Sequence, residues 1–388
     1  MASARLDALL LMQPENVQWA AGASPGVAAN WRRAGAAIVI VPADPAAPLG
    51  AVVGDLQAKS FQAQSGIDRV RAQPIWVDAT TLPGNVSDWR KSIGSGARPA
   101  TFDADIAFAH ARDLLGPLAK GRVGVEESFI SAADMRALSA ALPDANLVDA
   151  SRDVERLRMV KHPQEIEWLS QGARAAEAGI RAMIGEVCAG VATSHLERVW
   201  REAALAEARK LAPSAAISTW AYISIGEDGF APGGPAKTGD IIKADVGCVV
   251  NGYSSDCART FAFGEPSAIA SEIYAALLRA FHDALSLMKP GTPLSALHAR
   301  ATETMREAGF TSYGRGHFGH SCGASVWSEE APFISADEPT PLERGMVMAL
   351  ETPWYVRGVG GFIIEDQFVI DGEDATPAWS LSRDLISL

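Results

Sequence analysis

The segment Ile241–Phe263, IIKADVGCVVNGYSSDCARTFAF, decides the fold, because two β-rich runs flank the dipeptide Asn251-Gly252. Asn-Gly between such runs is the strongest short signal for a hairpin with a two-residue turn. That turn places residue 250 opposite 253 and residue 247 opposite 256. Since side chains alternate along a strand, Asp245 and Asp256 are then diagonal neighbours on one face, about 7–8 Å apart or somewhat less between Cβ atoms.

This pair of strand carboxylates points to a metal site. Asp is depleted in strands, and Asp245 interrupts an apolar run. A buried carboxylate needs a partner or a metal, and two at this spacing can hold one ion or a pair about 3.5–4 Å apart. The hairpin alone is equally compatible with two solvated carboxylates.

Two later strand-like segments carry further acids. Met346–Glu351 (MVMALE) ends on Glu351, and Phe362–Ile370 (FIIEDQFVI) contains Glu365, each at a position where a core residue is expected. The intervening VRGVGG is a glycine-rich turn, so the two acids are predicted to lie on neighbouring strands. A core salt bridge is the other interpretation of Glu365.

The segment Gly314–Gly323, GRGHFGHSCG, holds His317 and His320, two of only seven histidines. Glycine lets the backbone approach a ligand closely, although a loop histidine can also be purely structural. Four carboxylates and one imidazole suit a divalent pair such as Mn²⁺, Zn²⁺, Co²⁺ or Fe²⁺.

The organisation of the chain changes near residue 155. Before it, a buried strand at Ala36–Val41 and a helix at Ser131–Leu142 predict alternating α/β structure. After it, charged helical segments are followed by strand-rich runs. We expect an α/β N-terminal domain at residues 1–154 and a second domain at residues 155–388.

These motifs together resemble the pita-bread family of metallopeptidases, which includes methionine aminopeptidase, aminopeptidase P, prolidase and creatinase. KADVG…NGYSSDCARTF resembles the family's two-Asp motif, GHSCG its Gly-His-x-x-Gly motif, and LETPWY and IIEDQFVI its two Glu motifs. RLDALLLMQPENVQWAAG and RLRMVKHPQEIEWL resemble the N-terminal domain and linker of the aminopeptidase P, prolidase and creatinase branch.

The resemblance implies an α+β pita-bread catalytic domain after the α/β domain, and a homodimer. It also implies two divalent ions (Mn, Zn, Co or Fe) whose ligands are Asp245, Asp256, His320, Glu351 and Glu365. A metal-bridging hydroxide would attack the carbonyl carbon of an amide or peptide bond, as in Xaa-Pro aminopeptidases and prolidases. Glu351 and His320 would be catalytic, with Glu351 as the proton shuttle.

Two substrate histidines of the family's peptidases are missing. Gly233 follows Pro232 where one is expected, and Trp327 stands at the position of the other. The substrate is therefore expected to be a short peptide or a small non-peptide amide. We expect the pocket to be lined by the residues Trp220, Tyr222, His317, Trp327 and Trp354, although each could instead be a core or interface residue.

Three alternatives stay open. One is a creatinase-like C–N hydrolase that acts on a small nitrogenous compound without metal; the others are a lyase and a non-catalytic peptide-binding member. All five ligand positions are kept, which favours the metal-dependent hydrolase.

The composition of the chain excludes some classes of binding partner and some cellular locations. A formal net charge of -12 argues against nucleic acid and against docking on an anionic membrane. No uncharged run is long enough to span a bilayer, and Met1–Gly22 lacks the pattern of a signal peptide. We therefore expect a cytoplasmic protein with four reduced cysteines.

Overall fold

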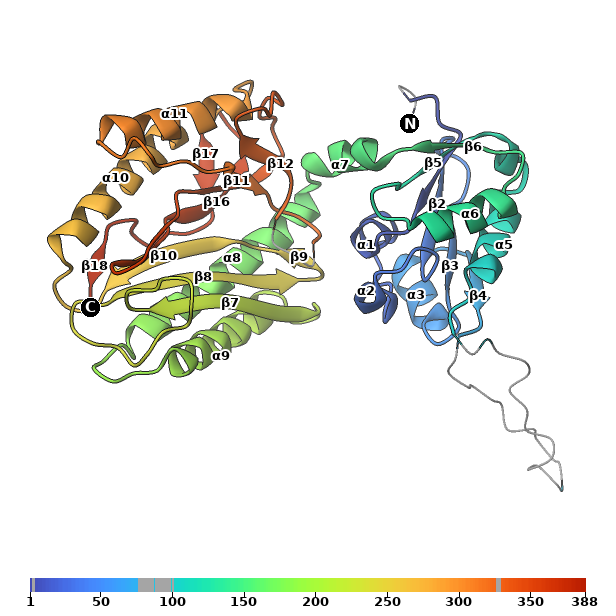
Figure 1. The fold of residues 1–388 in the computed structure, drawn as a ribbon. Coiled ribbons are helices and arrows are strands. Elements are labelled where there is room, and N and C mark those ends of the chain that lie inside the picture. The colour runs from blue at the N-terminus through green and yellow to red at the C-terminus, as the bar shows by residue number, and fades with distance from the viewer. Residues whose placement is uncertain (2–3, 76–86, 88–98, 100, 326–328) are drawn as a thin grey trace. The chain divides into compact units, whose positions relative to one another are not determined.

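The computed structural model describes residues 1, 4–75, 87, 99, 101–325 and 329–388. The chain forms two compact units, Met1–Val154 and Glu155–Leu388 (Figure 1). Helix α7 (Ser151–Met159) spans the boundary between them.

The N-terminal unit contains a six-stranded mixed sheet in the order β4-β3-β2-β1-β5-β6. Its strands are β1 (Ala8–Leu11), β2 (Ile38–Pro42), β3 (Gly50–Gly54), β4 (Arg69–Gln73), β5 (Arg122–Val125) and β6 (Asn146–Asp149). Its helices are α1 (Pro14–Ala21), α2 (Ala28–Trp31), α3 (Ala58–Ser65), α5 (Ala104–Leu115), the 3-10 helix η1 (Gly116–Lys120) and α6 (Ala132–Ala141). The prediction of an α/β N-terminal part is confirmed.

Both faces of this sheet are buried, as the side chains of β1 show. Leu10 packs in a core that includes Phe108 of α5, whereas Leu9 packs in a second core that includes Phe61 of α3. Because side chains alternate along a strand, an apolar run such as ALLL supplies both cores at once.

The C-terminal unit is built on a curled antiparallel half-barrel, with strand order β12-β11-β13-β16-β10-β8-β7. Its strands are β7 (Ile217–Ile225), β8 (Ile241–Val250), β9 (Tyr253–Ser254), β10 (Cys257–Ala262), β11 (His317–Ser321), β12 (Glu330–Ser335), β13 (Val347–Glu351), β14 (Trp354–Val356), β15 (Gly360–Phe362), β16 (Glu365–Ile370), β17 (Ala375–Pro377) and β18 (Ile386–Ser387). Its long helices are α8 (Pro163–Ile184), α9 (Thr193–Leu211), α10 (Ala268–Leu285) and α11 (Leu294–Glu307).

The four long helices cover one face of this sheet (Figure 1). Ala244 and Val246 of β8 pack with α8 and α9, and Met348 and Leu350 of β13 pack with α10 and α11. The intervening side chains, such as that of Asp245, therefore lie on the opposite face, which we call the site face.

The hairpin between β8 and β10 has the predicted register. Asn251 and Gly252 both have positive φ, 49° and 83°, as a type I′ turn requires. Val250 pairs with Tyr253, and Asp245 pairs with Ala258. Asp245 and Asp256 thus lie on one face, as the sequence predicted.

Close packing of α8 on α9 depends on Gly179. A Cβ atom at this position would lie 2.7 Å from two atoms of the Trp200 indole and 2.8 Å from the Trp200 carbonyl oxygen. Trp200 is fully buried, and its Nε1 donates to the carbonyl of Ala176. The indole therefore has little room to move aside.

We predict that Gly179→Ala destabilises the protein by about 1–3 kcal/mol, because overpacking outweighs the better helix propensity of alanine. Urea unfolding measures the change. Gly185→Ala is the matched control, since its Cβ atom would lie no closer than 3.4 Å to another atom. Equal stability of the two variants would contradict the packing argument.

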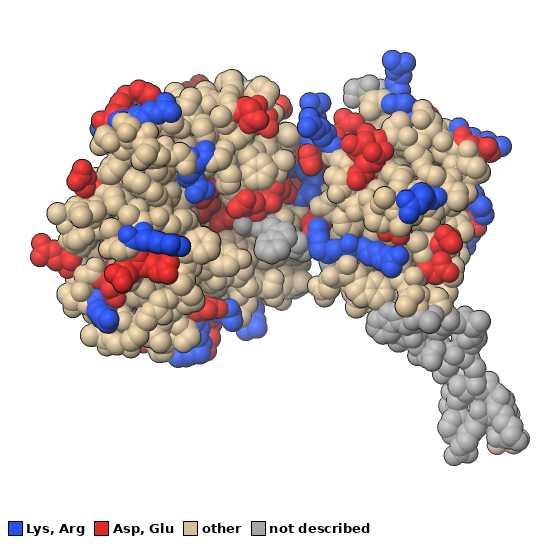
Figure 2. All heavy atoms as spheres, viewed as in Figure 1, with Lys and Arg blue, Asp and Glu red and all other residues tan. Residues whose placement is uncertain are grey.

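Charged side chains of both signs are interspersed over both units in the view of Figure 2. Within the described residues, no helix is both long and apolar enough to cross a bilayer.

Candidate metal centre

One row of paired residues crosses five strands of the site face. Tyr222 of β7 pairs with Asp245 of β8, which pairs with Ala258 of β10. Ala258 pairs with Glu365 of β16, and Glu365 pairs with Glu351 of β13. Three of the four expected carboxylate ligands therefore lie in one line across the sheet.

The fourth carboxylate, of Asp256, forms a compact group with His320 and Glu365. One ligand atom from each of these buried residues lies within 4.8 Å of the others. His320 Nε2 is 3.5 Å from Asp256 Oδ2 and 3.8 Å from Glu365 Oε1. His320 Nδ1 lies 3.1 Å from the Ser321 carbonyl oxygen. A proton on Nδ1 would be donated there, which leaves Nε2 available to a metal.

Buried polar atoms that have no hydrogen-bond partner among the described residues lie on the site face and suit a bound cation. Asp256 Oδ1 is buried without a hydrogen-bond partner in the described part of the chain, and so are both amide atoms of Gln367. Glu351 and Glu365 are direct cross-strand partners and are only 7% and 2% exposed. Like charges placed opposite each other are unfavourable unless a cation lies between them. The residues present therefore fit a divalent metal.

Electrostatics supports the same conclusion. Burial raises the pKa of Asp245 to about 7, and the charge of Asp256 adds to the effect. Burial and the charge of Asp256 likewise raise the pKa of Glu365 well above its ordinary value. Burial alone would lower the pKa of His320, but the interactions with Asp256 and Cys322 together outweigh this and raise the pKa well above its ordinary value. Without a metal, protons must compensate the crowded negative charge.

Asp245 and Glu351 have basic neighbours. Lys243 Nζ lies 3.7 Å from Asp245 Oδ2. Arg315 Nη2 donates to Glu351 Oε1 at 3.0 Å, and His317 Nδ1 lies 3.3 Å from the same oxygen. Lys243 and Arg315 were not predicted as site residues. Strand alternation could have identified Lys243, which stands two residues before Asp245 in the apolar run IIKADV.

A bulge in β11 brings His317 to the site. The pairing of β11 with β12 shifts between His317 and His320, and Gly319 has a φ of 132°. A Cβ atom at Gly319 would lie 2.0 Å from the Ala349 carbonyl oxygen. In a regular strand, residues three apart point to opposite faces, but here the two imidazole centroids are 6.4 Å apart.

Comparison with known proteins identifies the family. The model of metallopeptidase family M24 matches residues 167–372, more than half of the chain, and the model of the creatinase/prolidase N-terminal domain matches residues 1–160. Putative dipeptidase YkvY of Bacillus subtilis is 30% identical over 271 residues, which are 69% of this chain and 73% of that protein. The chain belongs to metallopeptidase family M24. The predicted family and the pita-bread fold of the C-terminal unit are confirmed.

Other similar proteins agree with this assignment. Uncharacterized peptidase YqhT of Bacillus subtilis is 30% identical over 260 residues, 64% of this chain and 70% of that protein. The X-Pro aminopeptidase of Thermotoga maritima matches 100% of this chain and 97% of its own, with a TM-score of 0.76 and 21% identity. The Xaa-Pro dipeptidase of Bacillus anthracis matches 100% of this chain and 96% of its own, with a TM-score of 0.78 and 22% identity. At these identities the two structures show the fold alone.

The aromatic residues expected to line the substrate pocket of this M24 protein have different surroundings. Trp220 and Tyr222 lie on the site face, with ring centroids 5.6 Å apart. Trp354 packs against Phe310 and Tyr313 beside the core. Trp327 lies outside the described residues.

The backbone conformation at Gly233 explains why no histidine stands at this position. This residue has a φ of 83°, and a Cβ atom there would lie 1.9 Å from the Ile225 carbonyl oxygen. The Ile225 amide donates to the carbonyl of Pro232 at 3.0 Å, which closes the turn. The turn has no room for a side chain at the position where the resemblance predicts a histidine.

Arg259 anchors the strand that carries Glu365. Its Nη1 donates to the Glu365 carbonyl at 2.8 Å, and its Nη2 donates to Asp366 Oδ1 at 2.7 Å. Asp366 also accepts a hydrogen bond from Arg383, and both Arg259 and Asp366 are almost completely buried. This network on the helix-covered face fixes the backbone from which Glu365 reaches the site.

Glu330 anchors the end of β11 beside His320. Its carboxylate accepts from Lys161 Nζ at 3.0 Å and also from Arg158. Lys161 Nζ donates to Ser321 Oγ at 2.6 Å as well. Burial would raise the pKa of Glu330, but the charges of Arg158 and Lys161 outweigh it and lower the pKa below its ordinary value.

We predict that Glu330→Gln destabilises the protein by about 3–5 kcal/mol at pH 7, because it leaves Lys161 buried without its anion. Since the folded-state pKa of Glu330 is lowered, this contribution is complete above the unfolded-state pKa and is lost as the pH falls through the folded-state value. The gap between wild type and variant should therefore narrow below about pH 4. Urea unfolding at several pH values measures it.

The exposed Glu303→Gln variant is the control, because Glu303 lies on the surface, 3.9 Å from Arg306, in an ion pair whose side chains are both 56% exposed. It should change stability by less than about 1 kcal/mol. A gap for Glu330→Gln that stays constant from pH 7 to pH 3 would contradict the ion-pair explanation.

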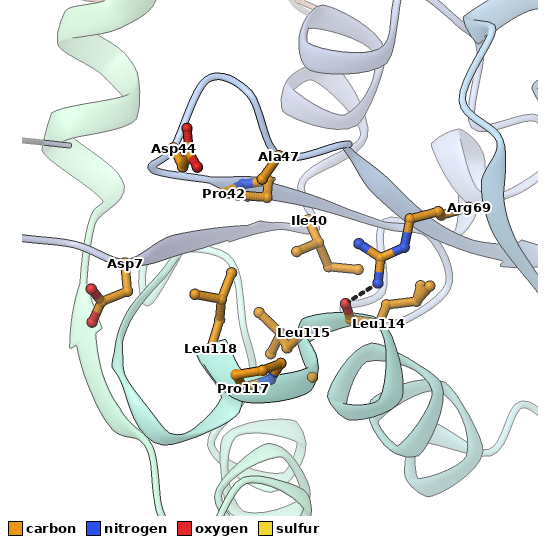
Figure 3. A pocket seen from close by; sticks show the side chains of 11 residues that line it. Asp7, Ile40, Pro42, Asp44, Ala47, Arg69, Leu114, Leu115, Pro117 and Leu118 are labelled. Atoms are coloured by element: carbon orange, nitrogen blue, oxygen red, sulfur yellow. Dashed lines mark hydrogen bonds between the residues drawn. The ribbon is translucent and has the colours of Figure 1, made fainter.

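A separate pocket of about 290 Å³ lies within the N-terminal unit (Figure 3). It is lined mainly by apolar residues of β2 and η1, and Arg69 at its edge donates to the Leu114 carbonyl. Its lining includes none of the expected metal ligands, so it is distinct from the metal centre.

Proposed function

We propose that this M24 hydrolase cleaves the amide bond of short peptides, dipeptides above all, and that the reaction depends on divalent metal. The observation that carries the proposal is the buried Asp256, His320 and Glu365 group on the site face. A related protein named as a dipeptidase supports the choice of substrate class.

The proposed centre holds two ions, with Mn, Zn, Co and Fe as candidates. Asp256, His320 and Glu365 would hold one, and Asp245 and Glu351, from the same cross-strand row, would complete the pair. Bound ions of this kind act as Lewis acids and lower the pKa of a bound water. Carboxylate oxygens with one imidazole suit these metals, and their availability often decides between them.

Glu351 is the proposed proton shuttle. Because Arg315 donates to its Oε1, Oε2 is the oxygen that would take a proton from the attacking water and pass it to the leaving amine. The hydrogen bond from Arg315 also fixes the carboxylate rotamer, so proton transfer needs little reorganisation.

His317 is the proposed donor to the substrate in place of the missing histidines. The Gly319 amide can donate to its Nδ1 at 3.3 Å, and the proposed role uses the tautomer that carries its proton on Nε2. Burial lowers the pKa of His317, which keeps the ring neutral near pH 7. Nε2–H can then donate to a carbonyl oxygen, and Trp220 and Tyr222 would form the neighbouring wall.

Hydrolysis of Ala-Pro, Ala-Leu and Ala-Pro-Ala by Mn²⁺-loaded protein tests the function. We predict turnover that Asp256→Asn reduces by at least about 100-fold, more than the loss of an outer-shell partner usually causes. The variant should also lose bound metal, as should Glu365→Gln, and mass spectrometry of the metal content measures this. Asp374→Asn, at a side chain that is 82% exposed, should change neither activity nor metal content.

Two outcomes would contradict the proposal. Metal-loaded protein that hydrolyses none of the peptides would point to a non-peptide amide, and small amides and ureido compounds would be tested next. Metal-free protein with full activity, or an active Asp256→Asn variant, would favour the creatinase-like alternative.

The homodimer and the cytoplasmic location implied by the sequence stay predictions. Light scattering of the purified chain would determine the first, and fractionation of cells that express it would determine the second.

A further inference from the structure

Lys243 is a buried cation on the site face with an incomplete set of contacts. It is 5% exposed, and the ion pair that its ammonium forms is long. The closest carboxylate oxygen is Asp245 Oδ2 at 3.7 Å, and the centroid of the Tyr355 ring is 5.3 Å away. A single long ion pair compensates a largely buried charge only in part, so an anion that enters the site can make a closer contact with this ammonium.

The two side chains opposite Lys243 on the neighbouring strands already form hydrogen bonds with backbone groups. Thr260 faces it from β10, but its hydroxyl donates to the Ile363 carbonyl and accepts from the Ile363 amide. Ser224 faces it from β7, and its hydroxyl donates to the Gly229 carbonyl. Both hydroxyls are thus engaged with backbone groups.

Binding of metal would weaken the ion pair between Lys243 and Asp245. If Asp245 takes its proposed place as a ligand, its oxygens coordinate a cation, and that cation repels the ammonium. The face of Tyr355 contributes only a modest cation–π attraction. The loaded site would therefore contain a positive charge beside the metal to which an external anion can bind.

The surroundings of Lys243 suit an organic anion. Phe230 is 81% exposed and packs edge-on against Tyr355, with centroids 5.2 Å apart. The Tyr355 ring lies beside the ammonium, and Phe230 extends this apolar surface. A free amino group would be repelled here, so the amino end of a peptide must lie on the other side of the metal centre.

We propose that Lys243 binds the terminal carboxylate of a dipeptide and so selects dipeptides over longer chains. This inference rests on the proposed peptidase function. In a dipeptide the carboxylate lies one residue, about 3.3–3.6 Å, beyond the scissile carbonyl. Because Lys243 lies beside Asp245, a carboxylate this close to the scissile carbonyl stays near the ammonium. Each further residue would move the carboxylate away from the ammonium.

The test compares acids with amides. Mn²⁺-loaded wild type should have a higher kcat/KM for Ala-Pro than for alanyl-prolinamide or Ala-Pro-Ala. Lys243→Met should lower the acid-to-amide ratio of kcat/KM by at least about 10-fold, mainly through the KM of the acid, because a charge-assisted hydrogen bond is lost. Lys243→Arg should retain most of the ratio. Lys237→Met removes an exposed charge from the preceding loop and should leave the ratio unchanged.

Binding measurements keep the test independent of turnover. Calorimetry should show that metal-loaded wild type binds L-proline or L-leucine more tightly than the corresponding amide, and that Lys243→Met removes this preference. If no peptide is hydrolysed but the preference is present, the peptidase proposal fails and the carboxylate site stands. If wild type binds neither compound, or binds acid and amide equally, the carboxylate site is excluded.

Measurement of the metal content tests a different role for Lys243. If Lys243→Met instead raises the number of bound Mn²⁺ ions and leaves the acid-to-amide ratio unchanged, Lys243 competes with the second ion, and the proposal is overturned.

Discussion

Repulsion among four carboxylates, three of them buried and one part-buried, is the constraint on which the C-terminal unit depends. Asp245, Asp256, Glu351 and Glu365 share one face of a single sheet, and the opposite face is apolar and covered by helices. Strand alternation produces both faces from the same short segments, so the apolar packing that stabilises the unit also holds the acids together. The folded sheet therefore holds the four carboxylates close together, and only cations or protons can offset their repulsion.

The residues around the four carboxylates determine which positive charges can reach them. Arg259 and Glu330 belong to buried ion pairs that fix the strands carrying Glu365 and His320, yet neither is an expected ligand. Lys243 and Arg315 approach the ligand carboxylates directly and balance part of their charge. The site therefore combines a rigid frame with side chains whose partners can change when metal and substrate bind.

Much of this arrangement could be predicted from the sequence, because it follows local rules. Asn251-Gly252 determined the hairpin register, and alternation placed Asp245 on the face opposite the apolar side chains. The position of His317 could not be predicted, because the β11 bulge that turns it toward Glu351 depends on contacts with β12 and β13. The surroundings of Trp354 likewise depend on distant packing partners, Phe310 and Tyr313.

The turn at Gly233 has a consequence for redesign of the site. A side chain introduced there by a single substitution would collide with the Ile225 carbonyl oxygen, because a Cβ atom would lie 1.9 Å from it. The positive φ of Gly233 adds strain for any other residue. An engineer who wants a histidine at this position would therefore have to rebuild the backbone of the loop first, and only then choose the side chain.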